Sequence, residues 1–127
     1  MLRKFAAAAA VSTTKDEKQM PRIAPFVTSS GLVTFRGLFA ADMGKEYPGP
    51  VPFTPVGVRL QGGRAEVPAC VWTYGFTVDP KTNRPTEARK IEAGTFELVR
   101  SAGTWKVDTL RYAQFDCSKV VVRGPKF

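Results

Sequence analysis

The clearest structural signal in this chain is the segment 88–112, ARKIEAGTFELVRSAGTWKVDTLRY. Two runs rich in Ile, Thr, Phe, Val and Trp flank the short turn Ser101-Ala102-Gly103, a combination typical of a β-hairpin. We therefore expect two antiparallel strands, at 88–100 and 104–112. This hairpin indicates the fold class much more directly than it indicates a function.

The hairpin continues a β-meander that we expect to begin near residue 55. Strands are predicted at 55–60 and 64–78, with a turn at Gln61-Gly62-Gly63 between them and a polar loop at 79–87 after them.

Three of these strands change the phase of their apolar alternation. One inserted residue near each of Pro68, Gly94 and Asp108 would restore it, because a bulge shifts which face a side chain occupies. Bulges at similar heights on neighbouring strands bend a sheet sharply. The alternative is a sheet covered on both faces, which we expect a chain this short to achieve only by oligomerising.

Helices are predicted before the sheet, within residues 1–43. The alanine-rich run at 2–9 favours a helix that Ser12-Thr13-Thr14 end, and a second short helix or a pair of turns is expected at 16–26. Leu32, Phe35, Leu38 and Phe39 recur at helical spacing and should lie on the sheet.

The segment 44–55 contains four prolines in twelve residues, and therefore predicts an extended connector between helices and sheet. We expect a single α+β domain over 1–127: a helical part at 1–43, this connector, a strongly bent antiparallel meander at 56–113 and a tail at 114–127. The 127 residues leave no room for a second domain.

Composition excludes several kinds of chemistry. The chain has no histidine, so histidine-based nucleophile pairs and imidazole metal ligands are ruled out, and neither a catalytic residue, a metal site nor a cofactor is predicted. Two cysteines, Cys70 and Cys117, are too few and too far apart for a metal knuckle. We expect buried free thiols, with an oxidised pair as the alternative in a secreted protein.

The net charge of +8 favours anionic partners, but the basic residues form no continuous run. A mildly basic, solvated surface is therefore favoured over a dedicated nucleic-acid site. The apolar run at 5–11 is far too short to cross a bilayer, and we expect an ordered helix there, leaving open whether Met1 is the native start.

Several segments together resemble the nuclear transport factor 2-like superfamily. The N-terminal part is similar to the helix and helix-loop of extracytoplasmic modules in actinobacterial conjugation and secretion proteins, over residues 2–9, Thr14-Lys15-Asp16-Glu17 and 22–28. The C-terminal hairpin is similar to the paired last strands of the superfamily, over residues 94–100 and 103–107. The resemblance implies helices packed on a cone-like sheet, and a location on the extracytoplasmic face of a bacterial membrane. Otherwise, a large intracellular assembly is expected.

Enzymes of that superfamily place Asp and Tyr inside the cone, which makes Tyr74, Asp108 and Tyr112 the pocket candidates, with Asp116 a further carboxylate. We assign none of them a catalytic role, because tyrosines at a core rim usually keep a solvated hydroxyl and an aspartate at a bulge usually bonds nearby backbone.

Two further groups of residues bear on ligands. The aromatic row Trp72, Tyr74 and Phe76 lacks neighbouring basic residues, so packing against Leu32, Phe35 and Phe39 is favoured over stacking with nucleic acid. A loose basic group forms an anion-facing rim. Its members are Lys81, Arg84, Arg89 and Lys90.

The leading functional hypothesis is a non-catalytic interaction module, a subunit or domain of a larger protein machine of the conjugation or secretion type, with protein partners that include a second copy of itself. One alternative is a basic structural subunit of a nucleic-acid-containing particle or organellar complex. The other is a small pocket enzyme or ligand carrier of the isomerase or dehydratase type.

Overall fold

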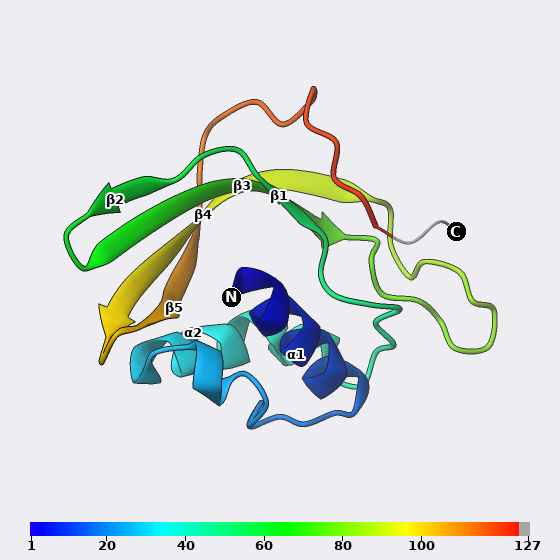
Figure 1. Ribbon diagram of the computed structural model, residues 1–127. Helices are drawn as coiled ribbons and strands as arrows, with labels where there is room; N and C mark the ends of the chain where they lie inside the picture. The colour runs from blue at the N-terminus through cyan, green and yellow to red at the C-terminus, as the bar shows by residue number, and fades with distance from the viewer. Residues whose placement is uncertain (125–127) are drawn as a thin grey trace.

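Two helices pack against one antiparallel sheet in the computed structural model, which describes residues 1–124 (Figure 1). The elements are α1 (Leu2–Thr14), η1 (Ala24–Phe26), α2 (Ser29–Phe39), η2 (Ala40–Asp42), β1 (Phe53–Pro55), β2 (Arg59–Gln61), β3 (Arg64–Tyr74), β4 (Lys90–Ser101) and β5 (Thr104–Tyr112). The predicted α+β class, with helices preceding an antiparallel meander, is confirmed. The end of the predicted tail, 125–127, lies outside the described residues.

The sheet runs in the order β1-β3-β4-β5, and β2 pairs with the first residues of β3 while β1 pairs with later ones. The hairpin predicted from 88–112 is the β4–β5 pair. Its turn residues Ala102 and Gly103 have φ values of 49° and 77°, the left-handed conformation that a two-residue hairpin turn of the I′ type requires. Figure 1 shows the long strands arching over the helices.

Only one of the three predicted bulges is confirmed. Val107 pairs with Leu98 and Thr109 with Glu97, so Asp108 is the inserted residue.

The bulges predicted near Pro68 and Gly94 are wrong, because Pro68 pairs with Thr95 and Ala69 with Gly94 in unbroken register. The irregularity in β3 falls later, between Trp72 and Tyr74.

The change of phase in β3 has a different cause: both faces of this strand are buried. Ala65, Val67, Ala69 and Val71 belong to the core shared with the helices.

Cys70 and Trp72, on the opposite face, pack in a second cluster with Phe76 and Val122. The C-terminal segment crosses back over the outer face of the sheet (Figure 1), so a single chain covers both faces and the expectation that this needs oligomerisation is wrong.

A disulfide between Cys70 and Cys117 ties this C-terminal segment to the centre of β3. The predicted free thiols are therefore wrong, and the oxidised alternative is correct. Periodicity could not reveal the pairing, because it depends on the chain turning back after β5. Thr54 Oγ1 also donates a hydrogen bond to the Val121 carbonyl oxygen at 2.7 Å.

The centre of the helical part matches one of its two expected alternatives, the turns. α1 continues through Ser12 and Thr13, which are buried, and the Thr13 hydroxyl donates to the Ala9 carbonyl oxygen at 2.9 Å. Residues 16–26 form turns and the short η1, which is the second of the two alternatives expected there, and not a second short helix. Glu17 there accepts hydrogen bonds from Arg22 instead of capping a helix, and proline interrupts the backbone at two positions.

The N-terminus of α2 is fastened to the bulge of β5. The Thr28 hydroxyl accepts the Gly31 amide and donates to Asp108 Oδ1 at 2.6 Å. Helix and strand approach so closely that a Cβ at Gly31 would lie 2.6 Å from the Val107 carbonyl oxygen.

The predicted apolar stripe of α2 is confirmed in part. Phe35 is buried in the core, and Leu32 and Phe39 pack against it, but Leu38 is exposed. Within the described residues, no helix has the length and apolar character needed to cross a membrane.

Candidate binding pocket

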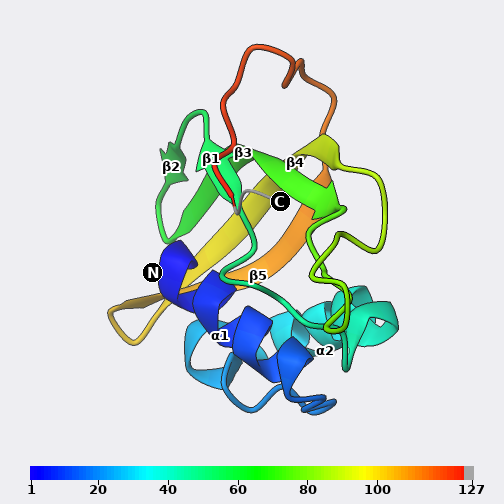
Figure 2. The same ribbon diagram turned by 90° about the vertical axis from the view of Figure 1, so that its right-hand side faces the viewer.

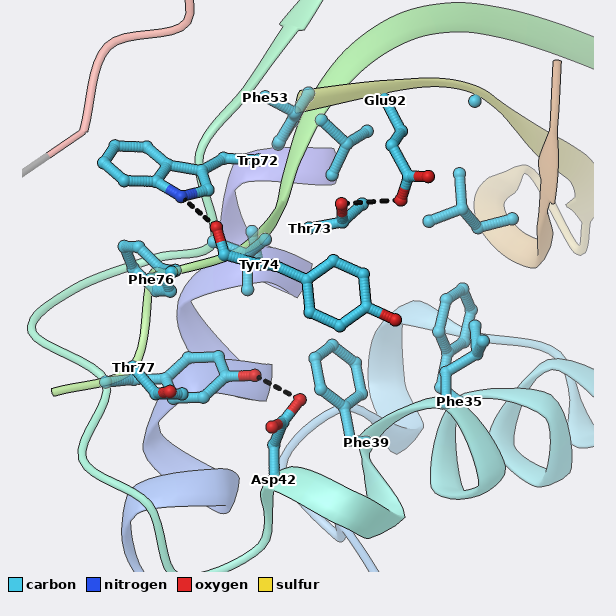
Figure 3. Close-up of a pocket in the computed structure, with 18 of the residues that line it drawn as sticks. Phe35, Phe39, Asp42, Phe53, Trp72, Thr73, Tyr74, Phe76, Thr77 and Glu92 are labelled. Atoms are coloured by element: carbon cyan, nitrogen blue, oxygen red, sulfur yellow. Dashed lines mark hydrogen bonds between the residues drawn. The ribbon is translucent and has the colours of Figure 1, made fainter. Parts of the chain in front are cut away.

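A cavity of about 340 Å³ lies between the inner face of the sheet, α1 and the C-terminal end of α2 (Figure 3). Figure 2 shows the two helices lying beneath the sheet. It is large enough for a small organic group, since ligand pockets typically measure about 300–1,000 Å³. Strand alternation puts residues at every second position of β3 and β4 on this face. The hydrogen bonds from Thr28 and Ser30 to Asp108, called the α2 clamp below, join the start of α2 to β5.

Most of the wall is apolar and aromatic, from Phe5, Phe35, Phe39, Phe53, Val71 and Phe96. The rings pack on one another, with 4.6 Å between the centroids of Phe5 and Phe35 and 5.3 Å between those of Phe53 and Phe96. Such tilted ring pairs hold each other's orientation, so the apolar wall is preformed.

Three large apolar or aromatic side chains both line the cavity and are substantially exposed. Leu38 is 51% exposed, Tyr74 47% and Tyr112 76%. Large apolar groups that remain this accessible around a cavity mark its mouth, and they are typical of contact sites.

The polar wall contains Glu92 of β4, a carboxylate that pairs with Lys90 just outside the lining. Glu92 faces the cavity opposite Val71 of β3, and its Oε2 accepts a hydrogen bond from Thr73 Oγ1 at 2.7 Å (Figure 3). Its Oε1 lies 2.9 Å from Lys90 Nζ. The Thr73 hydroxyl first, and then Lys90, hold the pKa of Glu92 below its ordinary value. Glu92 is therefore an ionised carboxylate at neutral pH.

Lys90 contacts an aromatic ring as well as this carboxylate. Its ammonium group lies 5.6 Å from the centroid of the Tyr74 ring, within the range of a cation–π contact. The pKa of Lys90 is raised, chiefly by Glu92 and to a smaller degree by the nearby phenols of Tyr74 and Tyr112. The ammonium group is thus placed among one carboxylate and two tyrosines.

A second polar group lies on the side of η2. Tyr47 Oη donates to Asp42 Oδ2 at 3.3 Å, and Lys45 Nζ lies 3.0 Å from Asp42 Oδ1 and 4.0 Å from Glu87 Oε1. Burial, followed by the Asp42 charge, raises the pKa of Tyr47, so its phenol remains protonated and acts as a donor.

These groups suit binding better than proton transfer. A general base works best when its pKa is close to the operating pH, which for a carboxyl group requires a raised value. The pKa of Glu92 is lowered instead, and both of its oxygens have partners. Within the part of the chain that the structure describes, no group of three acidic or cysteine side chains is placed to hold a metal ion.

The structure brings together two of the three pocket candidates. Tyr74 and Tyr112 line the cavity, but Asp108 does not: it accepts the hydroxyls of Thr28 and Ser30 and anchors α2. Asp116 lies in the C-terminal segment, where it accepts a backbone amide.

Sequence reasoning missed the pocket residues Glu92, Asp42 and Tyr47. Glu92 had a usable signal, since it shares its strand parity with Gly94 and Phe96, whereas Asp42 and Tyr47 lie in irregular segments without any periodic pattern.

The four basic residues predicted to form an anion-facing rim have different surroundings. Lys81 and Arg84 are exposed in the loop between β3 and β4. The Arg89 guanidinium lies 4.4 Å from the Trp72 ring centroid and donates to the Val122 carbonyl oxygen at 3.3 Å. Lys90 is engaged with Glu92 and Tyr74, so Arg89 and Lys90 contact different partners.

The aromatic row of β3 is also divided. Trp72 and Phe76 are buried, but their cluster includes Cys70 and Val122 rather than the residues of α2 that were expected to cover them. The packing partners were predicted wrongly because the C-terminal segment provides them. Only Tyr74 of this row is substantially exposed.

Comparison with protein-family models finds no match for this chain, and comparison with curated proteins finds none either.

Proposed function

We propose that this protein is a non-catalytic interaction module that receives an apolar group of a partner in the cavity beneath its sheet. The single observation that carries the proposal is the open, aromatic-lined cavity with Leu38, Tyr74 and Tyr112 exposed at its mouth. Burial of apolar surface there would supply the binding free energy. The module would serve as a subunit or domain of a larger protein machine.

The disulfide supports an oxidising location for this module. Disulfides persist in extracytoplasmic compartments and are rare where thiols are kept reduced. Together with helices followed by an arched meander, the Cys70–Cys117 bond supports our proposal of an extracytoplasmic module related to the nuclear transport factor 2-like superfamily.

The two alternatives from the sequence draw less support. An isomerase or dehydratase would need a carboxyl group with a raised pKa, and Glu92 has the reverse. A structural subunit bound to nucleic acid would need a continuous basic or stacking surface, whereas Trp72 and Phe76 are buried and Arg89 is engaged with the C-terminal segment.

Titration with a neutral apolar probe, 2-(2-naphthyl)ethanol, tests the proposal. We expect shifts of backbone amide resonances around the cavity in nitrogen-15 correlation spectra. Leu38→Glu should weaken binding about fivefold or more by placing a charge at the mouth. Val33→Glu is the matched control, because Val33 is 68% exposed on the same helix and does not line the cavity. Absence of binding, or equal weakening by both variants, would overturn the proposal.

A further inference from the structure

The pocket mouth contains a cation site that the chain fills with its own side chain. Lys90 and Glu92 are two positions apart on β4, so strand alternation places both on the same face. The Lys90 ammonium lies 2.9 Å from Glu92 Oε1 and over the ring of Tyr74, with Tyr112 close enough to affect its pKa. A carboxylate beside aromatic rings is a general arrangement for organic cations.

The carboxylate stays in place without the lysine, because it has independent support. The Glu92 side chain is only 20% exposed, and Thr73 donates to the oxygen that Lys90 does not contact. Glu92 Oε1, held in place through the Thr73 hydrogen bond to Oε2, and the Tyr74 ring therefore form a site that has support besides the bound ammonium.

The lysine itself is easily displaced. Its side chain is 58% exposed. Exposed ion pairs and exposed cation–π contacts are weak, and together they correspond to a factor of about five in an equilibrium constant. An incoming cation that also carries an apolar group would gain the cavity behind the site, which Lys90 does not fill.

The charges of the lining residues agree with a cationic ligand, although the whole chain is basic. Among the ionisable residues that line the cavity, Lys45 is bound to Asp42 and approaches Glu87. The Arg111 guanidinium is paired with Glu97 and Glu66, neither of which lines the cavity. Glu92 is thus a lining carboxylate whose partner, Lys90, comes from outside the lining.

We propose that the cavity takes an apolar group bearing an ammonium, which displaces Lys90 from Glu92 and Tyr74 as its ring or chain enters. This inference rests on the proposed function and specifies the chemistry of the ligand. Lys90 then acts as an internal competitor that sets the affinity. The cation has two sources, a free amine or a lysine side chain of a protein partner.

A matched series of probes tests this: 2-(2-naphthyl)ethylammonium, its neutral analogue 2-(2-naphthyl)ethanol and the anion 2-naphthylacetate, each titrated into the nitrogen-15-labelled protein. The cation should bind at least fivefold more tightly than the neutral probe, and the anion more weakly than both. Acetyl-Phe-Lys-amide, run beside the free amine, shows which source of the cation the site prefers.

Two variants separate the lysine from its carboxylate. Lys90→Ala should tighten binding of the cation about fivefold and leave the neutral probe within twofold, because only the cation competes with Lys90. Glu92→Gln should abolish the preference for the cation, because the negative charge is removed, while the glutamine oxygen can still accept the hydrogen bond from the Thr73 hydroxyl. Lys81→Ala, an exposed lysine outside the lining, should change nothing.

The outcomes distinguish this inference from the proposed function. If no probe of any charge binds, the proposed function fails and this inference fails with it. If the neutral probe binds as tightly as the cation, or if Lys90→Ala weakens binding of the cation, the pocket remains a binding site and the cation site is overturned.

Discussion

The disulfide between Cys70 and Cys117 joins two residues 47 positions apart, and its removal provides the most direct test of how this fold is held together. In the chain-entropy treatment, a closed loop of this length restricts the unfolded chain enough to stabilise the native state by about 4 kcal/mol. We therefore expect the free energy of unfolding to fall by about that amount when the bond is absent.

When the disulfide is absent, the structure should open first at the outer face of the sheet. Without the bond, the C-terminal segment is held by the Thr54 and Arg89 hydrogen bonds to the carbonyl oxygens of Val121 and Val122 and by the burial of Val122 against Trp72. Local opening of this segment exposes Trp72, which is 4% exposed in the native fold. Opening of this kind costs less than global unfolding.

Urea unfolding followed by tryptophan fluorescence measures the effect. A Trp105→Phe background leaves Trp72 as the reporter of the outer face. With a denaturant slope of about 2 kcal/mol/M, the midpoint should move down by about 2 M. Two perturbations are compared: reduction of the unmodified chain, and the double variant Cys70→Ala/Cys117→Ala.

The comparison separates the cross-link from packing, because Cys70 is fully buried and its truncation also leaves a small cavity. If the reduced protein loses less than about 1 kcal/mol while the double variant loses much more, the bond contributes little and the argument from loop closure is refuted. Similar losses for both support it.

Three further predictions concern the α2 clamp and the pocket carboxylate. Gly31→Ala should lower the free energy of unfolding, measured in urea, by about 1–3 kcal/mol, because the new Cβ would lie 2.6 Å from the Val107 carbonyl oxygen. Gly37→Ala is the control: a Cβ there has nothing within 4 Å, so this variant should raise the free energy of unfolding by up to about 1 kcal/mol. The reverse order would contradict the close approach of helix and strand. Asp108→Ala should cost about 1–3 kcal/mol by removing the acceptor at the start of the helix, and an unchanged unfolding midpoint would show that the clamp contributes nothing. The pKa of Glu92 is lowered in the folded state, so its ionised carboxylate stabilises the fold above the unfolded-state pKa of about 4.3, and this stabilisation is lost as the pH falls through the folded-state pKa. The difference in free energy of unfolding between the unmodified protein and Glu92→Gln should therefore shrink between pH 6 and pH 3. A difference that stays constant with pH would rule this linkage out.

Local sequence patterns were enough to place the helices before the meander and to locate the β4–β5 hairpin. A turn such as Ala102-Gly103 and an alternation such as Phe96 with Leu98 are read from neighbouring residues, and no distant contact is needed to interpret them. The bulge at Asp108 was found in the same way.

The candidate site was predicted less completely. Tyr74 and Tyr112 lie at the cavity, whereas Asp108 lies at the start of α2, because an aspartate at a bulge looks the same in sequence whether it faces a cavity or a helix terminus. The strand parity of Glu92 was a usable signal, but its position beside Thr73 of the neighbouring strand depended on the register of β3 and β4.

By itself, then, the amino-acid sequence determined the α+β class, the β4–β5 hairpin and, except for Leu38, the apolar stripe of α2, since these follow from interactions between residues close together in the chain. Tertiary structure alone decided the Cys70–Cys117 pairing, the burial of Trp72 under the C-terminal segment and the joining of Glu92 with Tyr74 at one cavity mouth. The physical reason is that each of these depends on where the chain returns after many residues, which local propensity does not encode.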